Sequence, residues 1–293
     1  MPFGRFVHIW SDKVIHLGGL VGDPACAIDE TLTIEINLTA TRLIAEVAKA
    51  NGVSRFIFAS TCSVYGASDE ILDENSSLNP VSLYAKSKIA SEEVLNNLHD
   101  SNFNITILRF GTIYGFSGRN RFDLVVNLLV AKALKEKKVT LFGGDQWRPF
   151  VHVDDASNAV NSILQAPIDL VSGEVFNVGS NEQNMTLTEV GELIIKLIPD
   201  AELVDSGSSD DRRNYRVKFD KINNVLKYKV NWTLQMGIEQ VVTSFSNNEI
   251  INYKDSRYSN VKQLTESEMN YETGWEGRLI NKIDSDISLA DDL

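Results

Sequence analysis

The chain has 293 residues and more acidic than basic side chains, 40 against 28, which gives a formal net charge of -12. Nucleic-acid-binding surfaces need clustered basic groups, so this composition argues against nucleic acid as a partner. The sequence holds no run of about 18 apolar residues, and its first residues lack the apolar core of a signal peptide. Two cysteines are too few for a disulfide framework. We therefore expect a cytoplasmic protein with no membrane partner.

Apolar runs of strand length alternate with helical patterns along the chain. Buried strands are predicted at 13–20, 55–60, 105–110 and 174–179, helices at about 30–50 and 84–98, and a polar loop at 69–80. The first of these helices is predicted to end at Asn51-Gly52. This alternation predicts an α/β protein with a parallel sheet covered on both faces. Sheets of this kind bind ligands at the carboxyl ends of their strands.

Tyr84 and Lys88 stand four residues apart in the second predicted helix. Residues i and i+4 share one face of a helix, so the Lys88 ammonium is expected near the Tyr84 phenol. A nearby cation lowers the pKa of a phenol, which is about 10 in water, and makes it usable as a base. The spacing alone is also compatible with an ordinary amphipathic helix.

A segment rich in hydroxyl groups, Ser60-Thr61-Cys62-Ser63-Val64-Tyr65-Gly66, directly follows the strand at 55–60. Its position at the carboxyl end of a strand is typical of ligand contacts in α/β sheets. The alternative is a turn held by bonds from hydroxyl side chains to the backbone.

Over about residues 12–245 the chain resembles the extended short-chain dehydrogenase/reductases, in the NAD-dependent epimerase/dehydratase group that acts on nucleotide sugars. The resemblance rests on several motifs in the family's order: Val14-Ile15-His16-Leu17, Asn37, the segment from Ser60 to Gly66, Tyr84 to Lys88, Leu108-Arg109-Phe110-Gly111-Thr112-Ile113-Tyr114-Gly115, and Arg148-Pro149-Phe150-Val151-His152-Val153-Asp154-Asp155.

The resemblance implies a role for each matching residue. The catalytic residues would be Thr61, which bonds the reacting sugar hydroxyl, Tyr84, which removes its proton, and Lys88, which holds the nicotinamide ribose. NAD would be the cofactor, and no metal is implied. The implied cofactor contacts are Gly18, Gly19, Asn37, Ser60, Tyr84 and Lys88. The implied contacts to the diphosphate of a nucleotide-sugar substrate are Asn127, Arg148 and Arg213.

The sequence leaves the roles of several arginines open. Arg148 could instead make a surface salt bridge, and Arg212 could take the place of Arg213. Arg119 and Arg121 could add positive charge to the site or lie in a solvated loop.

The resemblance implies an activity, and two departures narrow it. Enzymes of this kind oxidise C4 of the sugar, let the keto sugar rotate, and return the hydride to the other face. The family's 4,6-dehydratases follow the threonine with an Asp-Glu pair, and the 3,5-epimerases carry a cysteine two places after it. This chain has Cys62-Ser63 there, so both reactions are disfavoured and Cys62 is expected to be a buried apolar side chain. The expected activity is nucleotide-sugar 4-epimerisation. The alternatives are a 4-ketosugar reductase and a non-catalytic nucleotide-sugar-binding or scaffold protein.

The N-terminal part of the chain departs most from the family's pattern. Family members open with a Gly-x-x-Gly-x-x-Gly turn that holds the cofactor pyrophosphate at a helix N-terminus. This turn is not found before the strand at 14–20, so the expected fold is a Rossmann-like sheet that lacks its N-terminal part, through truncation or loss, and has this strand at its edge. We therefore expect impaired NAD binding and impaired activity.

The expected division of the chain has three parts. Residues 1–180 would form the incomplete NAD-binding domain, with 115–148 contributing to the substrate side. Residues 181–250 would form a smaller substrate-binding α/β part, and 251–293 a polar tail. A homodimer is a further expectation, because an open sheet edge invites pairing with another chain.

Overall fold

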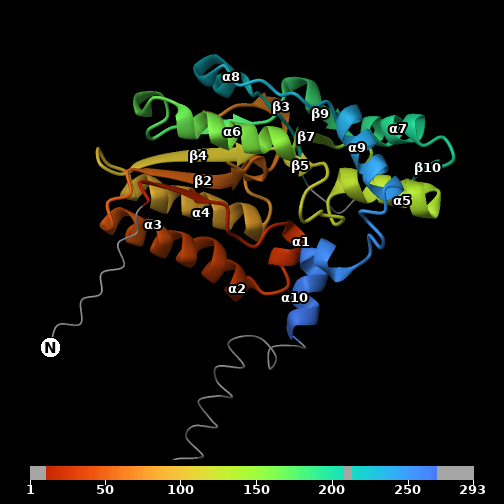
Figure 1. Cartoon of the computed structure of the whole chain (residues 1–293), viewed down its shortest axis with the longest axis horizontal. Helices are drawn as coiled ribbons and strands as arrows, with labels where there is room; N and C mark the ends of the chain where they lie inside the picture. The colour runs from red at the N-terminus through yellow and green to blue at the C-terminus, as the bar shows by residue number, and fades with distance from the viewer. Residues whose placement is uncertain (1–10, 208–212, 269–293) are drawn as a thin grey trace, which may run out of the picture.

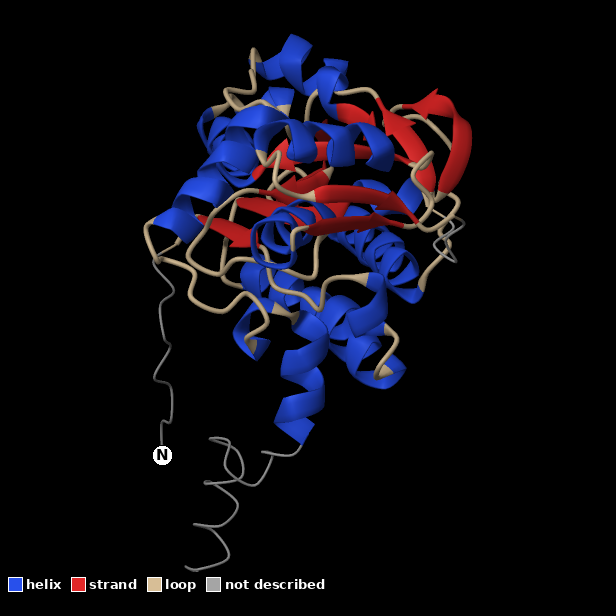
Figure 2. Ribbon diagram, turned by 90° about the vertical axis from the view of Figure 1, so that its right-hand side faces the viewer, coloured by secondary structure: helices blue, strands red, loops and turns tan. Residues whose placement is uncertain are grey.

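The computed structural model describes residues 11–207 and 213–268. Its central sheet has four parallel strands in the order β1 (Lys13–His16), β2 (Arg55–Thr61), β4 (Asn104–Phe110) and β8 (Val175–Val178). Figure 2 shows strands running through the middle of the molecule with helices on both sides. The predicted α/β class with a parallel, Rossmann-like sheet is confirmed.

Helices cover both faces of this sheet. Helices α3 (Ala40–Ala50) and α4 (Leu83–Leu98) lie on one face, and α6 (Val153–Gln165) lies on the other (Figure 1). Side chains of a strand alternate between its two faces, so Phe56 packs with the cluster on the α3 side while Ile57 packs with the cluster on the α6 side.

The helix predicted at 30–50 is interrupted. It consists of α2 (Glu30–Ile34), a π-helical turn (Glu35–Thr39) and α3. Its predicted end holds, because α3 stops at Ala50 and Gly52 follows with φ 77°. Single π-helical turns often occur at functional sites, and this one contains the buried Asn37.

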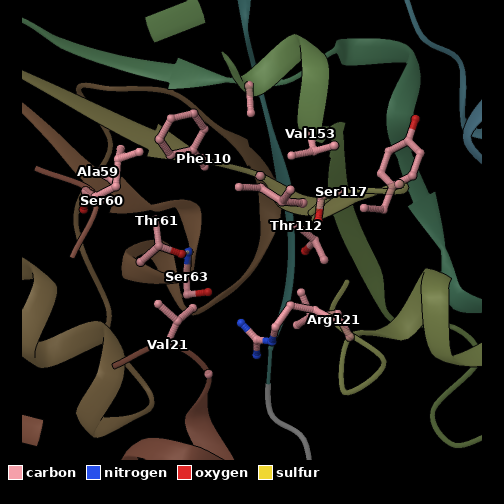
Figure 3. Close-up of a pocket in the computed structure, with 18 of the residues that line it drawn as sticks. Val21, Ala59, Ser60, Thr61, Ser63, Phe110, Thr112, Ser117, Arg121 and Val153 are labelled. Carbon is pink, nitrogen blue, oxygen red and sulfur yellow. Dashed lines mark hydrogen bonds between the residues drawn. The ribbon is translucent and has the colours of Figure 1, made fainter. Parts of the chain in front are cut away.

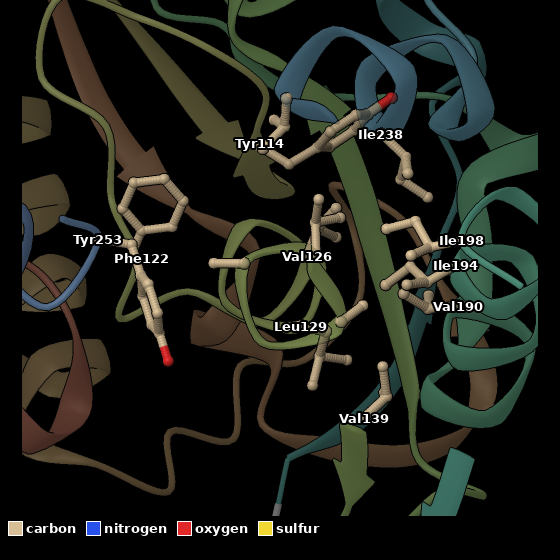
Figure 4. Close-up of a cluster of buried hydrophobic side chains, with 14 of the residues drawn as sticks. Tyr114, Phe122, Val126, Leu129, Val139, Val190, Ile194, Ile198, Ile238 and Tyr253 are labelled. Carbon is tan, nitrogen blue, oxygen red and sulfur yellow. The ribbon is translucent and has the colours of Figure 1, made fainter. Parts of the chain in front are cut away.

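A second core lies beside the sheet (Figure 4). Three helices surround it: α5 (Val125–Glu136), α7 (Leu187–Leu197) and α9 (Leu234–Ser246). Their apolar faces meet in one cluster, which also includes the aromatic rings of Tyr114 and Phe122.

Short strands link this core to the central sheet. They form three small sheets: β5 (Thr112–Tyr114) with β7 (Trp147–His152) and β9 (Asn184–Thr186), β6 (Lys138–Leu141) with β10 (Glu202–Asp205), and β3 (Ala67–Leu72) with β11 (Asn214–Val217). The loop predicted at 69–80 is thus partly wrong, because its first residues pair with a strand far along the chain.

The remaining helices are short: α1 (Asp23–Cys26), α8 (Asp220–Leu226) and α10 (Asn260–Glu268). The 3-10 turns are at Cys62–Tyr65, Ile168–Leu170, Asn181–Gln183 and Ser256–Tyr258. None of the helices in the described part of the chain combines the length and the apolar character that crossing a bilayer requires.

Part of the expected polar tail packs against the protein. Tyr253 and Tyr258 are buried in the second core, and α10 begins two residues after Tyr258. Residues 269–293 of that tail lie outside the described residues.

Candidate functional site

A cleft of about 670 Å³ opens at the carboxyl ends of the central strands (Figure 3). Leu17, Thr61 and Gly111 mark the ends of β1, β2 and β4 on its wall. This is the edge of the sheet at which the fold was expected to bind its ligand.

The structure brings the three predicted catalytic residues together in this cleft. Thr61 is the last residue of β2, and Tyr84 and Lys88 project from successive turns of α4. The Thr61 hydroxyl acts on the Tyr84 phenol and lowers its pKa. Helix α4 starts at this point because Ser82 caps it, with the Ser82 hydroxyl accepting the Ala85 N–H at 3.2 Å.

Burial controls the electrostatics of this group. Desolvation raises the pKa of the Tyr84 phenol, and the hydrogen bond from Thr61 opposes this effect. Desolvation also lowers the pKa of Lys88 to about 8. The expected lowering of the tyrosine pKa is therefore not what the structure gives, because burial outweighs the favourable contacts of the phenolate.

Lys88 is held by the backbone of β2. Its ammonium donates a 2.8 Å hydrogen bond to the carbonyl of Ala59 and lies 4.6 Å from the centre of the Phe58 ring. An ammonium has three donors, and this bond to Ala59 uses one of them.

The two glycines expected to contact the cofactor differ in their surroundings. A Cβ atom at Gly19 would lie 3.1 Å from Asn37 Oδ1 and 3.4 Å from Lys88 Nζ. Glycine thus lets the backbone approach Lys88, as a cradle for the nicotinamide ribose requires. A Cβ atom at Gly18 would instead meet the His16 ring at 3.2 Å.

Asn37 fixes the turn that contains these glycines. Its Oδ1 accepts the Leu20 N–H at 2.7 Å, and its Nδ2 donates to the Leu20 carbonyl at 3.0 Å and to Ser87 Oγ at 3.1 Å. The structure therefore places Asn37 as the link between this turn and α4, and Asn37 is not among the residues that line the cleft.

Ser60 lines the cleft and connects it to a buried ion pair. Its hydroxyl donates to Glu92, one turn beyond Lys88 on α4. Arg109 of β4 donates to both oxygens of the same carboxylate, at 2.6 and 3.1 Å. The ion pair ties the Tyr84–Lys88 helix to two strands of the sheet. Its two side chains are 6% and 5% exposed.

Two of the predicted substrate contacts line the cleft. Asn127 lies at the start of α5, and its amide bonds both the N–H and the carbonyl of Gly115, at 3.1 and 3.0 Å. Arg213 lies across the cleft, with its Nε 3.4 Å from a carboxylate oxygen of Asp23.

Arg148 is not among the residues that line the cleft. Its buried guanidinium donates to the carbonyls of Trp147 and Arg213 and to Gln146 Oε1. The structure therefore gives Arg148 a part in holding the Arg213 backbone. Its contact with a substrate diphosphate, which the family resemblance implies, stays a prediction.

Sequence reasoning missed part of the wall. Ser63 faces the cleft and lies 3.4 Å from the hydroxyl of Tyr215, a residue of β11. Arg121, one of the two arginines left open, points into the cleft in Figure 3. The signal for Tyr215 is a long-range strand pairing, which local patterns do not reveal.

Cys62 is fully buried as expected, and its Sγ donates to the Arg109 carbonyl at 3.2 Å. Within residues 11–207 and 213–268, no three His, Cys, Asp or Glu side chains gather in a way that could hold a metal ion.

Known proteins resemble this chain in sequence. A family model described as "NAD dependent epimerase/dehydratase family" matches residues 5–179. The chain is 34% identical over 157 residues to an uncharacterised UDP-glucose epimerase, YtcB, of Bacillus subtilis (strain 168), covering 53% of this chain and 48% of the relative. It is 29% identical over 225 residues to a putative UDP-glucose 4-epimerase of Methanocaldococcus jannaschii, covering 73% and 70%.

A solved structure resembles the fold closely. The UDP-glucuronic acid 4-epimerase of Bacillus cereus, in complex with UDP-glucuronic acid and NAD, superposes with a TM-score of 0.73 at 25% identity, covering 81% of this chain and 76% of that one. The chain spans about half the length of the first curated relatives it matches, 48% and 56%. The family model matches more than half of this chain, so the chain belongs to the NAD-dependent epimerase/dehydratase family.

Proposed function

We propose that this chain carries the nicotinamide-binding and sugar-binding parts of a nucleotide-sugar 4-epimerase. The observation that carries the proposal is the meeting of Thr61, Tyr84 and Lys88 in the main cleft, with Tyr84 and Lys88 one helical turn apart on α4. A hydroxyl, a phenol and an ammonium at the carboxyl ends of parallel strands form a proton-transfer site.

Tyr84 takes the proton of the sugar C4 hydroxyl, which Thr61 orients with its own hydroxyl. NAD, held at its nicotinamide ribose by Tyr84 and Lys88, would supply the hydride transfer that oxidises C4 and then reduces the keto sugar from the opposite face. Tyr84 then gives the proton back to the C4 oxygen, which restores the C4 hydroxyl of the sugar. Because burial raises the pKa of Tyr84, the phenol needs positive charge beside it to act as a base. We propose Lys88, one turn along α4, as a source of that charge.

The opposite side of the cleft is suited to the nucleotide diphosphate. Arg121 and Arg213 both line it, and a guanidinium suits phosphate oxygens through paired hydrogen bonds. Cys62 and Ser63 stand where the family's dehydratases carry acidic groups, which favours epimerisation over loss of water.

Gly19, Tyr84 and Lys88 would hold the nicotinamide end of NAD, and β1 stands at one end of the described central sheet. The Gly-x-x-Gly-x-x-Gly turn that holds the cofactor pyrophosphate in this family is not found in the sequence. We therefore propose that this chain by itself binds NAD weakly and has impaired activity.

Mass spectrometry of the denatured protein for released NAD, with a coupled assay on UDP-glucose and UDP-glucuronate, tests both parts. Epimerisation with added NAD that disappears in Tyr84→Phe supports the function. Stoichiometric NAD in the purified chain contradicts the proposed weak binding. Net consumption of reduced nicotinamide would identify a 4-ketosugar reductase instead. Binding of nucleotide sugar with no turnover would identify a non-catalytic binding protein.

For the expected homodimer we propose the outer face of α3. Leu43, Ile44 and Val47 are exposed there, while Ala45 and Ala48 of the same helix are buried against the protein. Light scattering of the protein and of Leu43→Glu tests this face: a dimer that becomes a monomer supports it, and a monomeric parent protein refutes it.

A further inference from the structure

Asn260, the first residue of α10, joins two loops at the mouth of the cleft. Its Nδ2 donates a 2.8 Å hydrogen bond to the carbonyl of Val21, in the turn after β1. Its backbone N–H donates to Asp123 Oδ2 at 2.9 Å. Asn260 lies outside the residues that match the family model, which end at 179.

These bonds are part of a closed ring of contacts. Asp123 pairs with Arg121 through two hydrogen bonds of 2.6 and 2.9 Å. The Arg121 guanidinium in turn lies 3.5 Å from the position that a Cβ atom on Gly22 would occupy. The ring therefore runs from Val21 through Asn260, Asp123 and Arg121 back to Gly22, the neighbour of Val21. Val21, Gly22 and Arg121 all line the cleft.

Arg119 adds a second connection to the same helix. Its Nη2 donates to Asn260 Oδ1 at 3.0 Å and to Gln263 Oε1 at 2.7 Å, and its Nε donates to the carbonyl of Arg257 at 2.9 Å. Arg119 also lines the cleft. Arg121 thus pairs with the carboxylate of Asp123, whereas these three hydrogen bonds of Arg119 go to a backbone carbonyl and two side-chain amides.

We propose that Asn260 is a positioning residue, which sets the spacing between the Val21–Gly22 turn and the Arg119–Asp123 loop and so places Arg121 for the anionic part of a nucleotide sugar. The proposal rests on the proposed function, since it assigns the ligand of the same cleft. The side-chain amide is suited to this task because it donates to one loop and accepts from the other.

Two variants of Asn260 test its bond to Val21 separately from its bond to Arg119. Asn260→Ala removes both side-chain bonds and keeps the backbone bond to Asp123. Asn260→Asp keeps an oxygen for Arg119 and removes the donor to Val21. Asn224→Ala, on the exposed face of α8, is the matched control.

The experiment measures UDP-glucose affinity by calorimetry at low salt, hydrogen exchange by mass spectrometry, and Tm. For Asn260→Ala we expect affinity about three- to tenfold weaker, the effect of one lost hydrogen bond. Amide exchange should rise in both 19–23 and 117–123. For Asn260→Asp the rise should be confined to 19–23. The control should change neither quantity.

A lower Tm with unchanged affinity and unchanged exchange in these two segments would show a merely structural role and overturn the proposal. If the unsubstituted protein does not bind UDP-glucose, the proposed function fails, and exchange alone judges Asn260: faster exchange of both loops in Asn260→Ala supports the link, and unchanged exchange refutes it.

Discussion

Lys88 donates its hydrogen bond to the carbonyl of Ala59, two residues before the end of β2, where Thr61 stands. The ammonium and the Thr61 hydroxyl are thus positioned by one strand, while Lys88 and Tyr84 share one helix. A shift of α4 along β2 would disturb all three groups at once.

The pKa of Lys88, lowered by burial to about 8, makes stability depend on pH. Between about 8 and the ordinary lysine value of about 10.4, the unfolded chain binds a proton at this residue and the folded chain does not, so stability rises with pH. Below about 8 both states are charged, and the folded state bears the full cost of the buried cation. Urea unfolding of the protein and of Lys88→Met at pH 7 and pH 9.5 checks this. The protein should gain stability relative to the variant at the higher pH, and equal changes in both would rule out the depressed pKa.

Tyr84→Phe should lower the epimerase rate by about 10²- to 10⁴-fold, because proton transfer by a positioned side chain contributes a factor of that size. Thr61→Ala should lower it by about tenfold to a hundredfold, for one lost hydrogen bond to a charged group. UDP-glucose affinity, measured by calorimetry, should change by no more than about twofold in Tyr84→Phe. A variant of Tyr84 that keeps full turnover would remove this residue from the mechanism.

Replacing one partner of the Glu92–Arg109 ion pair should destabilise the protein strongly. Both side chains are almost fully buried, so Arg109→Met leaves an uncompensated carboxylate and should lower the free energy of unfolding by about 3–5 kcal/mol. The double variant Glu92→Leu with Arg109→Met removes both charges and should lose less than the sum of the single losses. Urea unfolding of the four proteins gives the coupling. Strictly additive losses would mean that the two groups do not interact.

Gly66 should not tolerate a side chain. It has φ 73°, and a Cβ atom there would lie 1.7 Å from the carbonyl oxygen of Asn79. Gly66→Ala should therefore destabilise the protein by more than the strain of the backbone angle alone, which is about 1–3 kcal/mol. Gly52→Ala is the control for strain alone, because Gly52 has φ 77° and nothing lies within 4 Å of its Cβ position. Equal losses of unfolding free energy in the two variants would contradict the clash.

The sequence was sufficient for the elements whose signal is local. The strand at 55–61 is a continuous apolar run, and the helix from Leu83 to Leu98 starts at a serine cap, so both could be predicted closely. Tyr84 and Lys88 could be singled out for the same reason, since they stand four residues apart in this helix, whereas Thr61 was singled out by the family resemblance.

Residues whose place depends on distant pairing could not be found this way. Arg148 matched a motif, but its guanidinium bonds the carbonyl of Arg213, 65 positions away, and it is not among the residues that line the cleft. Tyr215 reaches the cleft because β11 pairs with β3, a strand in what the sequence suggested was a loop. Asn260 gave no signal, because its partners Val21 and Asp123 are separated from it by most of the chain.

The pairing of β3 with β11 also sets the order in which the site can form. Tyr84 and Lys88 lie in the first third of the chain and can pack on β2 early, during synthesis from the N-terminus. The opposite wall, with Arg213 and Tyr215, waits for β11 to find β3 across a long loop, and such non-local pairing is slow. A nascent chain therefore carries Tyr84 and Lys88 in a half-open cleft until the last third of the protein arrives.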